Sequence, residues 1–150
     1  MMFFVRFLIT IFALSNSLVA HCEPIRASQV AIQKYAPLLS ACAGEAIINK
    51  VKDRNIVCLI GSITSKLADS INSFDGRIDA IVVNSPGGDV LSAIKIGTRI
   101  SRDHPMLVVE RECSSSCANY LVPAAMKVAV MPDALIIMHG CVPRSILEYA

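Results

Sequence analysis

Two adjacent glycines, Gly87 and Gly88, follow an apolar run that ends in Asn84-Ser85-Pro86, and they precede a segment with helical spacing. A plain turn needs one glycine at most, so the pair indicates that another group approaches the main chain closely here. Uncovered N–H groups at the start of a helix can hold a phosphate, a carboxylate or a transient oxyanion. A tight turn that needs only positive φ is an equally good explanation of the pair alone. The pattern completes neither a P-loop nor a dinucleotide fingerprint.

Segments with strand-like and helix-like patterns alternate on both sides of the glycines. Apolar β-rich runs cover 55–63, 77–83 and 106–112, and helical spacing covers 64–74 and 89–103. This order predicts an α/β domain with a mainly parallel sheet. Sites in such sheets gather at the carboxyl ends of the strands, which is where the glycine pair lies.

The remaining segments have weaker patterns. In the segment 114–126 a helix is expected until Pro123, and two short strands are expected around Pro132-Asp133. Weak helical spacing over 28–42 is expected to break at Pro37, because proline removes a main-chain donor. We divide the chain into a leader (1–20), a lead-in segment (21–54) and one domain (55–150).

The first 20 residues have the layout of a secretory signal peptide. Arg6 is the only charged side chain, 7–14 is apolar apart from Thr10, and Ala20 offers a small residue before a cut. This predicts export with cleavage after Ala20. The alternative is an uncleaved leader that anchors the chain in a membrane, although its apolar core is short for a span.

Charge and cysteine content narrow the function classes. The net charge is +2 with both signs spread along the chain, so no nucleic-acid partner is expected. All six cysteines lie beyond the leader, which permits disulfides without choosing the pairs. Cys113 and Cys117 either pair around a turn or pack. No second ligand pair with zinc spacing accompanies them, so no metal is expected.

Two further places can carry chemistry. Ser114, Ser115 and Ser116 stand between a predicted strand and a predicted helix, where a hydroxyl can act as a nucleophile. Capping of the helix explains one or two of them equally well. His139 closes an apolar run, and a lone histidine there is more often structural. Together with Gly88 these residues supply the nucleophile, base and oxyanion hole that acyl transfer needs.

Residues 56–142 resemble the proteolytic subunit of Clp protease and its relatives in the ClpP/crotonase superfamily, especially the exported ClpP-like proteins of bacteria. "VVNSPGGDVLSAIKIG" is similar to the oxyanion-loop strand and helix of that family, "SCANYLVPAAMK" to its nucleophile helix, and "MPDALIIMH" to the strand that ends in its histidine. The resemblance implies a ClpP/crotonase-like fold and a periplasmic serine peptidase that acts on peptides or proteins as a homo-oligomer. It implies no cofactor. Export argues against the ATPase partner of ClpP, because ATP is scarce outside the cytoplasm.

The resemblance also assigns roles to residues. It places the nucleophile on Ser116 and the base on His139, while the Cys-x-Ser-x-Cys pattern of exported relatives favours Ser115 as an alternate nucleophile. The oxyanion and substrate-binding groups fall on the main chain of Gly87, Gly88 and Cys117.

The sequence departs from the family pattern after the histidine. The orienting Asp of the family lies well downstream, whereas Glu148 is the sole acid after His139. The C-terminal helix of the fold is also missing, so the domain is expected to be incomplete at its C-terminus. A Ser-His pair, an inactive binding or assembly domain and a truncated relic are the alternatives. A crotonase-like enzyme acting on acyl-CoA is a weaker one, because coenzyme A is cytoplasmic.

Overall fold

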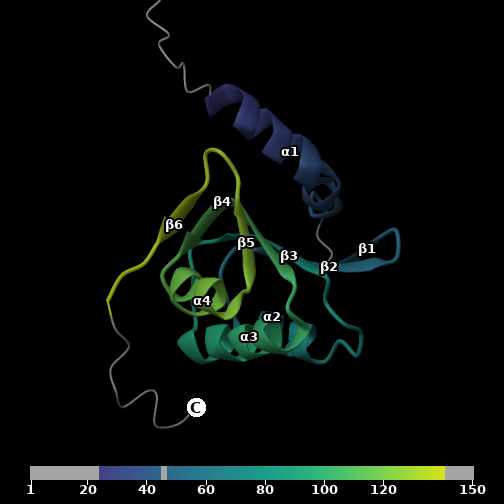
Figure 1. Ribbon diagram of the computed structural model, residues 1–150. Helices are drawn as coiled ribbons and strands as arrows, with labels where there is room; N and C mark the ends of the chain where they lie inside the picture. Colours follow the sequence, from purple (N-terminus) through teal and green to yellow (C-terminus); the bar gives the residue numbers. More distant parts are fainter. Residues whose placement is uncertain (1–23, 45–46, 141–150) are drawn as a thin grey trace, which may run out of the picture.

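The computed structural model describes residues 24–44 and 47–140. Its centre is a six-stranded sheet in which β1 to β5 are neighbours in chain order and β6 also pairs with β4 (Figure 1). Every neighbouring pair is parallel except β1–β2. The predicted α/β class with mainly parallel strands is therefore confirmed. The strands are β1 (Ile48–Val51), β2 (Arg54–Ile60), β3 (Ala80–Ser85), β4 (Met106–Ser114), β5 (Lys127–Val130) and β6 (Leu135–Ile137).

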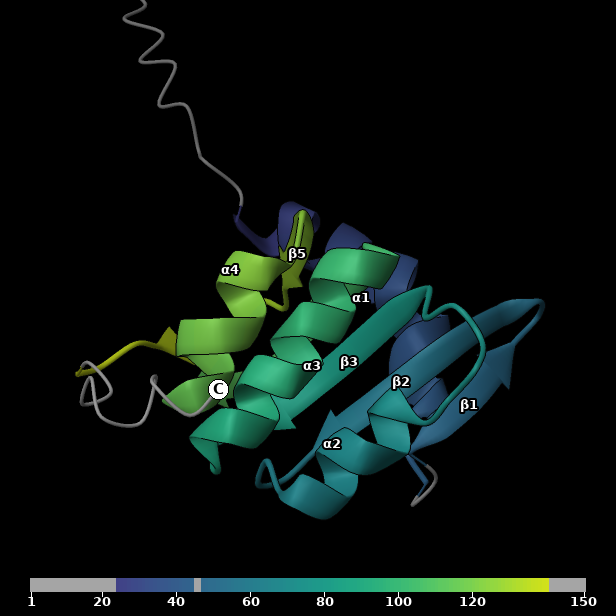
Figure 2. The same cartoon turned by 90° about the horizontal axis from the view of Figure 1, so that it is seen from below.

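Helices cover both faces of this sheet. Figures 1 and 2 show α1 on one face and α2, α3 and α4 on the other. Ile81 and Val83 of β3 point into the core under α2 and α3, and Val82 between them points toward α1. A strand buried on both faces reads as a continuous apolar run, as β3 does. The helical elements are α1 (Pro24–Ala41), α2 (Ser65–Asn72), α3 (Val90–Asp103), the π-helical turn η1 (Cys117–Leu121) and α4 (Val122–Ala124).

The N-terminal part differs from the expectation, because α1 continues through Pro37 instead of breaking there. Proline removes one main-chain donor and disfavours a helix interior. Tertiary contacts outweigh this effect: Leu38 and Cys42 are buried against the sheet, and Cys42 forms a disulfide with Cys58 of β2. The edge strand β1 was not predicted, and it pairs with β2 through a turn at Lys52, whose φ is 56°.

The helix expected from Ser114 until Pro123 is also different at its start. β4 extends to Ser114 because Ser114 pairs with Ile137 of β6. Helical φ and ψ begin at Ser116, and the π-helical turn follows from Cys117. The serines that follow β4 therefore form a tight connection between a strand and a helix.

A buried ion pair supports the loop before β3. Arg99 Nε lies 2.7 Å from Asp103 Oδ2, and the two side chains are 3% and 8% exposed. Arg99 also donates to main-chain carbonyls of the segment 71–76. Burial raises the pKa of Asp103, but hydrogen bonds from the Ile78 N–H, from Arg102 and from Arg99 outweigh it, so the pKa lies below its ordinary value.

Several predictions fall outside the described residues. These are the signal peptide at 1–20, with cleavage after Ala20, and the sole acid after His139, Glu148; Cys22 and Cys141, for which the sequence chose no partner, also lie outside them. Among the helices of the described ranges, none is long and apolar enough to cross a membrane.

Candidate active site

The glycine pair lies between β3 and α3, at the carboxyl edge of the sheet. Gly87 has a φ of 93° and Gly88 a φ of 149°, values that favour glycine. A Cβ on Gly88 would lie 2.3 Å from the carbonyl oxygen of Ile63, and one on Gly87 would lie 2.6 Å from that of Ser114. Two other main-chain segments thus approach this loop, which explains why the sequence needs two glycines.

The segment after β2 holds one side of the glycine loop. The Ile63 N–H donates to the Gly87 carbonyl at 2.8 Å, and the Ile63 carbonyl accepts from the Asp89 N–H at 2.9 Å. Asp89 then caps α3 by accepting from the Ser92 N–H at 2.8 Å. Hydrogen bonds from the Ser92 hydroxyl and N–H lower the pKa of Asp89. These bonds leave the Gly88 N–H free to face the serine turn.

The serine turn meets the other side of the glycine loop. Ser116 Oγ accepts a hydrogen bond from the Gly88 N–H at 2.8 Å and donates to the Gly88 carbonyl at 3.1 Å. Ser116 is only 2% exposed. Ser115 is half-buried and has a φ of 55°, which is uncommon for a residue other than glycine. Of the two predicted nucleophiles, Ser116 is the one whose hydroxyl contacts Gly88.

A disulfide closes the serine turn. Cys113 is a buried residue of β4, Cys117 is the first residue of η1, and their Cα atoms are 5.3 Å apart. The sequence left open whether these cysteines pair or pack, and the structure pairs them. The Cys117 N–H lies at the start of η1, where N–H groups have no acceptor within the helix.

His139 lies two residues beyond the end of β6. Because β6 is parallel to β4, this position is at the same edge of the sheet as the serine turn. The His139 side chain is exposed. Within the described ranges no hydrogen bond joins its imidazole to Ser116. The structure thus brings Ser116 and the glycine loop into contact and leaves the imidazole of His139 without a bond to either.

Two polar residues near the site were missed by the sequence reasoning. The Glu112 carboxylate accepts a hydrogen bond from Ser114 Oγ. Asn119 Nδ2 donates to the His139 carbonyl at 2.9 Å. Neither residue belongs to a motif. The only local signals are the i, i+2 spacing of Glu112 and Ser114 on one strand face and the position of Asn119 one helical turn after Ser116.

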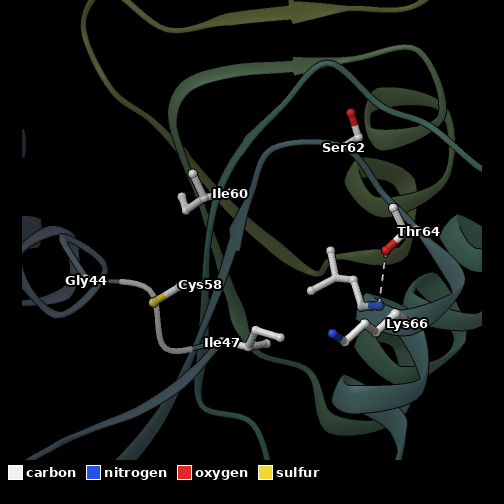
Figure 3. A pocket seen from close by; sticks show the side chains of 8 residues that line it. Gly44, Ile47, Cys58, Ile60, Ser62, Thr64 and Lys66 are labelled. Atoms are coloured by element: carbon white, nitrogen blue, oxygen red, sulfur yellow. Dashed lines mark hydrogen bonds between the residues drawn. The ribbon is translucent and has the colours of Figure 1, made fainter.

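A cavity of about 480 Å³ opens near the glycine loop (Figure 3). Ser62 and Thr64 line it, and they flank Ile63, which bonds to Gly87. Thr64 also caps α2 by accepting from the Leu67 N–H at 3.3 Å. The cavity is lined by apolar side chains and by the polar side chains of Ser62, Thr64 and Lys66. Its lining consists of Gly44, Ile47, Cys58, Ile60, Ser62, Thr64, Lys66 and Leu67. In the part of the chain that the structure describes, no group of three or more His, Cys, Asp or Glu could hold a metal ion.

Comparison with known proteins gives matches among solved structures alone. No family model matches the chain, and no curated protein matches it. A mutant of the 1510-N membrane-bound stomatin-specific protease matches with 17% identity and a TM-score of 0.47, covering 63% of this chain and 56% of that one. A ClpP1 mutant from Listeria monocytogenes matches with 20% identity and a TM-score of 0.47, covering 63% and 61%.

A second mutant of the stomatin-specific protease, in complex with a substrate peptide, matches with 18% identity and a TM-score of 0.46, covering 63% of this chain and 53% of that one. The chain thus spans between 53% and 61% of the length of these three structures. Similarity at this level does not transfer an activity, so function has to be argued from the site.

Proposed function

We propose that this chain is a ClpP-like serine hydrolase in which Ser116 attacks the carbonyl of a peptide bond. The observation that carries the proposal is the 2.8 Å hydrogen bond between the Gly88 N–H and Ser116 Oγ. It puts a hydroxyl and a main-chain donor within reach of one carbonyl group. Acyl transfer needs that arrangement, because the donor stabilises the oxygen on which negative charge develops.

The proposed reaction begins with a rotation of the Ser116 side chain. Its hydroxyl bonds to both main-chain groups of Gly88, so it has to leave them before the Gly88 N–H can donate to substrate. Ser116 Oγ then bonds to the carbonyl carbon while His139 takes the hydroxyl proton. The carbonyl electron pair moves to the oxygen, which accepts from the N–H groups of Gly88 and Cys117. His139 returns the proton to the leaving amine, and water releases the acyl group.

The histidine would act without an orienting acid from the described residues. No carboxylate in those ranges forms a hydrogen bond with the His139 imidazole. In a serine triad the acid holds the correct tautomer, and its loss lowers kcat by about 10⁴. The proposal is therefore a Ser-His pair with low intrinsic activity.

The proposal extends to substrate and location. The cavity beside Ile63, whose lining is partly apolar and partly polar, would receive a side chain of a peptide or protein substrate. The leader at 1–20 would direct the chain to the periplasm, and the chain would act as a homo-oligomer without an ATPase. A leader that stays uncleaved would keep it on the membrane.

The second candidate is a binding or assembly domain without catalysis. Ser116 is 2% exposed, and its hydroxyl bonds to the N–H and the carbonyl of Gly88. In a purely structural role these bonds would permanently join the loop after β3 to the turn after β4, and Ser116 would not react. The exposed His139, which has no bond to Ser116, favours this candidate.

Reaction with a fluorophosphonate probe separates the two candidates. The wild type, Ser116→Ala and Ser115→Ala are treated with the probe, and intact masses are measured. One adduct that disappears only in Ser116→Ala supports the hydrolase. An adduct lost only in Ser115→Ala moves the nucleophile to Ser115. A folded wild type without adduct contradicts catalysis by this chain, and the unlabelled mass reports whether 1–20 has been removed.

A further inference from the structure

His139 lies beyond the hydrogen-bonded part of its strand. The ladder between β4 and β6 ends with the pair Ser114 and Ile137. The Ser115 N–H adds one more bond, to the Ile137 carbonyl at 2.9 Å. Among the described residues that follow, 138–140, none forms a further bond with the sheet. The position of His139 therefore depends on contacts outside the sheet.

Asn119 supplies that contact. Its Nδ2 donates to the His139 carbonyl at 2.9 Å and lies 3.5 Å from the Gly140 carbonyl. Within the described ranges these are the hydrogen bonds that reach His139 and Gly140. The main-chain N–H of Asn119 donates to the Ser115 carbonyl at 2.8 Å. One residue thus bonds to the serine turn through its main chain and to the histidine segment through its side chain.

We propose that Asn119 is a positioning residue that sets the place of His139 relative to Ser116. The inference rests on the proposed hydrolase function. A side-chain amide suits this role, because its NH₂ group donates to a carbonyl without adding charge beside the imidazole. The η1 turn carries Asn119 and follows Ser116 directly, so the distance between the hydroxyl and the histidine main chain is fixed by a few short bonds. Proton transfer requires such control, since a displacement of about 1 Å can lower a rate by about 10².

Asn119→Leu tests the proposal, because leucine keeps the branched shape and lacks the donor. The matched control is Asn72→Leu: Asn72 Nδ2 also donates to a main-chain carbonyl, that of Ala68 at 2.9 Å, but in α2. The rate of fluorophosphonate labelling is measured against pH, together with Tm. Asn119→Ser, whose hydroxyl is too short to reach His139, is the second variant if Asn119→Leu does not fold.

The expected result is a labelling rate lowered by about tenfold or more in Asn119→Leu and unchanged in Asn72→Leu. The wild-type rate should rise with pH because the reaction needs a proton acceptor, and this rise should be smaller in Asn119→Leu. Equal rates and equal pH profiles in the wild type and Asn119→Leu would overturn the inference and leave the hydrolase standing. If Asn72→Leu lowered the labelling rate equally, general destabilisation would explain the loss, and the inference would be overturned. A wild type that is never labelled would remove the reaction, and the inference with it.

Discussion

Gly88 is the residue at which the main chains of three segments meet. Its N–H and carbonyl bond to Ser116, and a Cβ on it would lie 2.3 Å from the Ile63 carbonyl oxygen. We predict that Gly88→Ala lowers the free energy of unfolding by at least about 2 kcal/mol, because the loop has to move away from Ile63. Labelling of Ser116 should disappear with it. Urea denaturation and intact-mass measurement check the two effects.

Gly61 provides the control for this substitution. Its φ of 89° is also positive, but a Cβ on it would meet nothing within 4 Å. Gly61→Ala should therefore carry backbone strain of about 1 kcal/mol and leave labelling intact. If Gly61→Ala and Gly88→Ala lowered the free energy of unfolding equally, the need for glycine at position 88 would come from its positive φ and not from the close approach of Ile63.

Among the residues that the structure describes, Asp103 is one of two, with Asp89, whose lowered pKa should make the stability of the fold depend on acid, and Asp103 is the buried one. Its pKa is lower in the folded chain than in the unfolded one, so the unfolded chain binds more protons as pH falls. The stabilisation is complete above the ordinary carboxyl pKa of about 4 and is lost as pH falls through the lower folded value. Asp103→Asn should lower the free energy of unfolding at pH 7 by about 3 kcal/mol, because it leaves Arg99 buried without a counter-charge.

Urea denaturation at pH 7 and at pH 3 measures both parts of this prediction. The wild type should lose stability between these values, and Asp103→Asn should lose less. Asp69→Asn is the control, since Asp69 is 71% exposed and lies 3.9 Å from Lys95. Such surface pairs contribute little. A wild type and Asp103→Asn with the same acid dependence would show that other carboxylates control it.

At the scale of elements, the two disulfides have different tasks. The Cys113–Cys117 disulfide joins the end of β4 to the start of η1. The Cys42–Cys58 disulfide joins α1 to β2 and has a sequence separation of 16. A longer loop stabilises more, by about 3 kcal/mol for this length. We predict that Cys42→Ala with Cys58→Ala loses more stability but keeps labelling of Ser116.

The opposite result is expected for Cys113→Ala with Cys117→Ala. Removing this disulfide frees the serine turn, so labelling should fall by about tenfold or more while less stability is lost. Denaturation and labelling rates of the two double variants are compared under the same oxidising conditions. If the labelling rate fell in proportion to the loss of stability in both double variants, the Cys113–Cys117 disulfide would have no specific effect on the site.

At the scale of the whole molecule, one edge of the sheet is apolar and has no further strand paired with it among residues 24–44 and 47–140. Exposed apolar side chains gather on β5, β6 and the residues beside them: Met126, Val128, Val130, Leu135, Ile137 and Met138. Open edges and apolar patches of this kind promote association between chains. We predict that the protein self-associates and that Leu135→Lys shifts the equilibrium toward the monomer.

Sedimentation velocity over a range of concentrations measures this shift. Ile32→Lys is the control, because Ile32 is 48% exposed but lies on α1 rather than on β5 or β6. It should leave the distribution of species unchanged. A wild type that stays monomeric at all concentrations, or an equal effect of both variants, would contradict association through β5 and β6.

Much of the architecture could be predicted because it depends on local patterns. β3 is buried on both faces of the sheet, so it reads as a continuous apolar run. α3 is buried on one face, so its apolar residues recur at helical spacing, and both elements can be identified directly. The course of α1 could not be predicted. Pro37 is a local signal for a break, whereas burial of Leu38 and the disulfide to Cys58 are contacts with distant residues.

For the site, the sequence alone determined that two glycines, a group of serines and a histidine stand where parallel strands end. It could not determine that Ser116 rather than Ser115 contacts Gly88, that Cys113 pairs with Cys117, or that Asn119 bonds to His139. Backbone φ, helix capping and the burial pattern of an element depend on neighbours in sequence. They therefore leave a signal in the residue types and their spacing. Contacts across 28 or 20 positions depend on strand register and on the turn that follows each strand, and only the folded chain decides these.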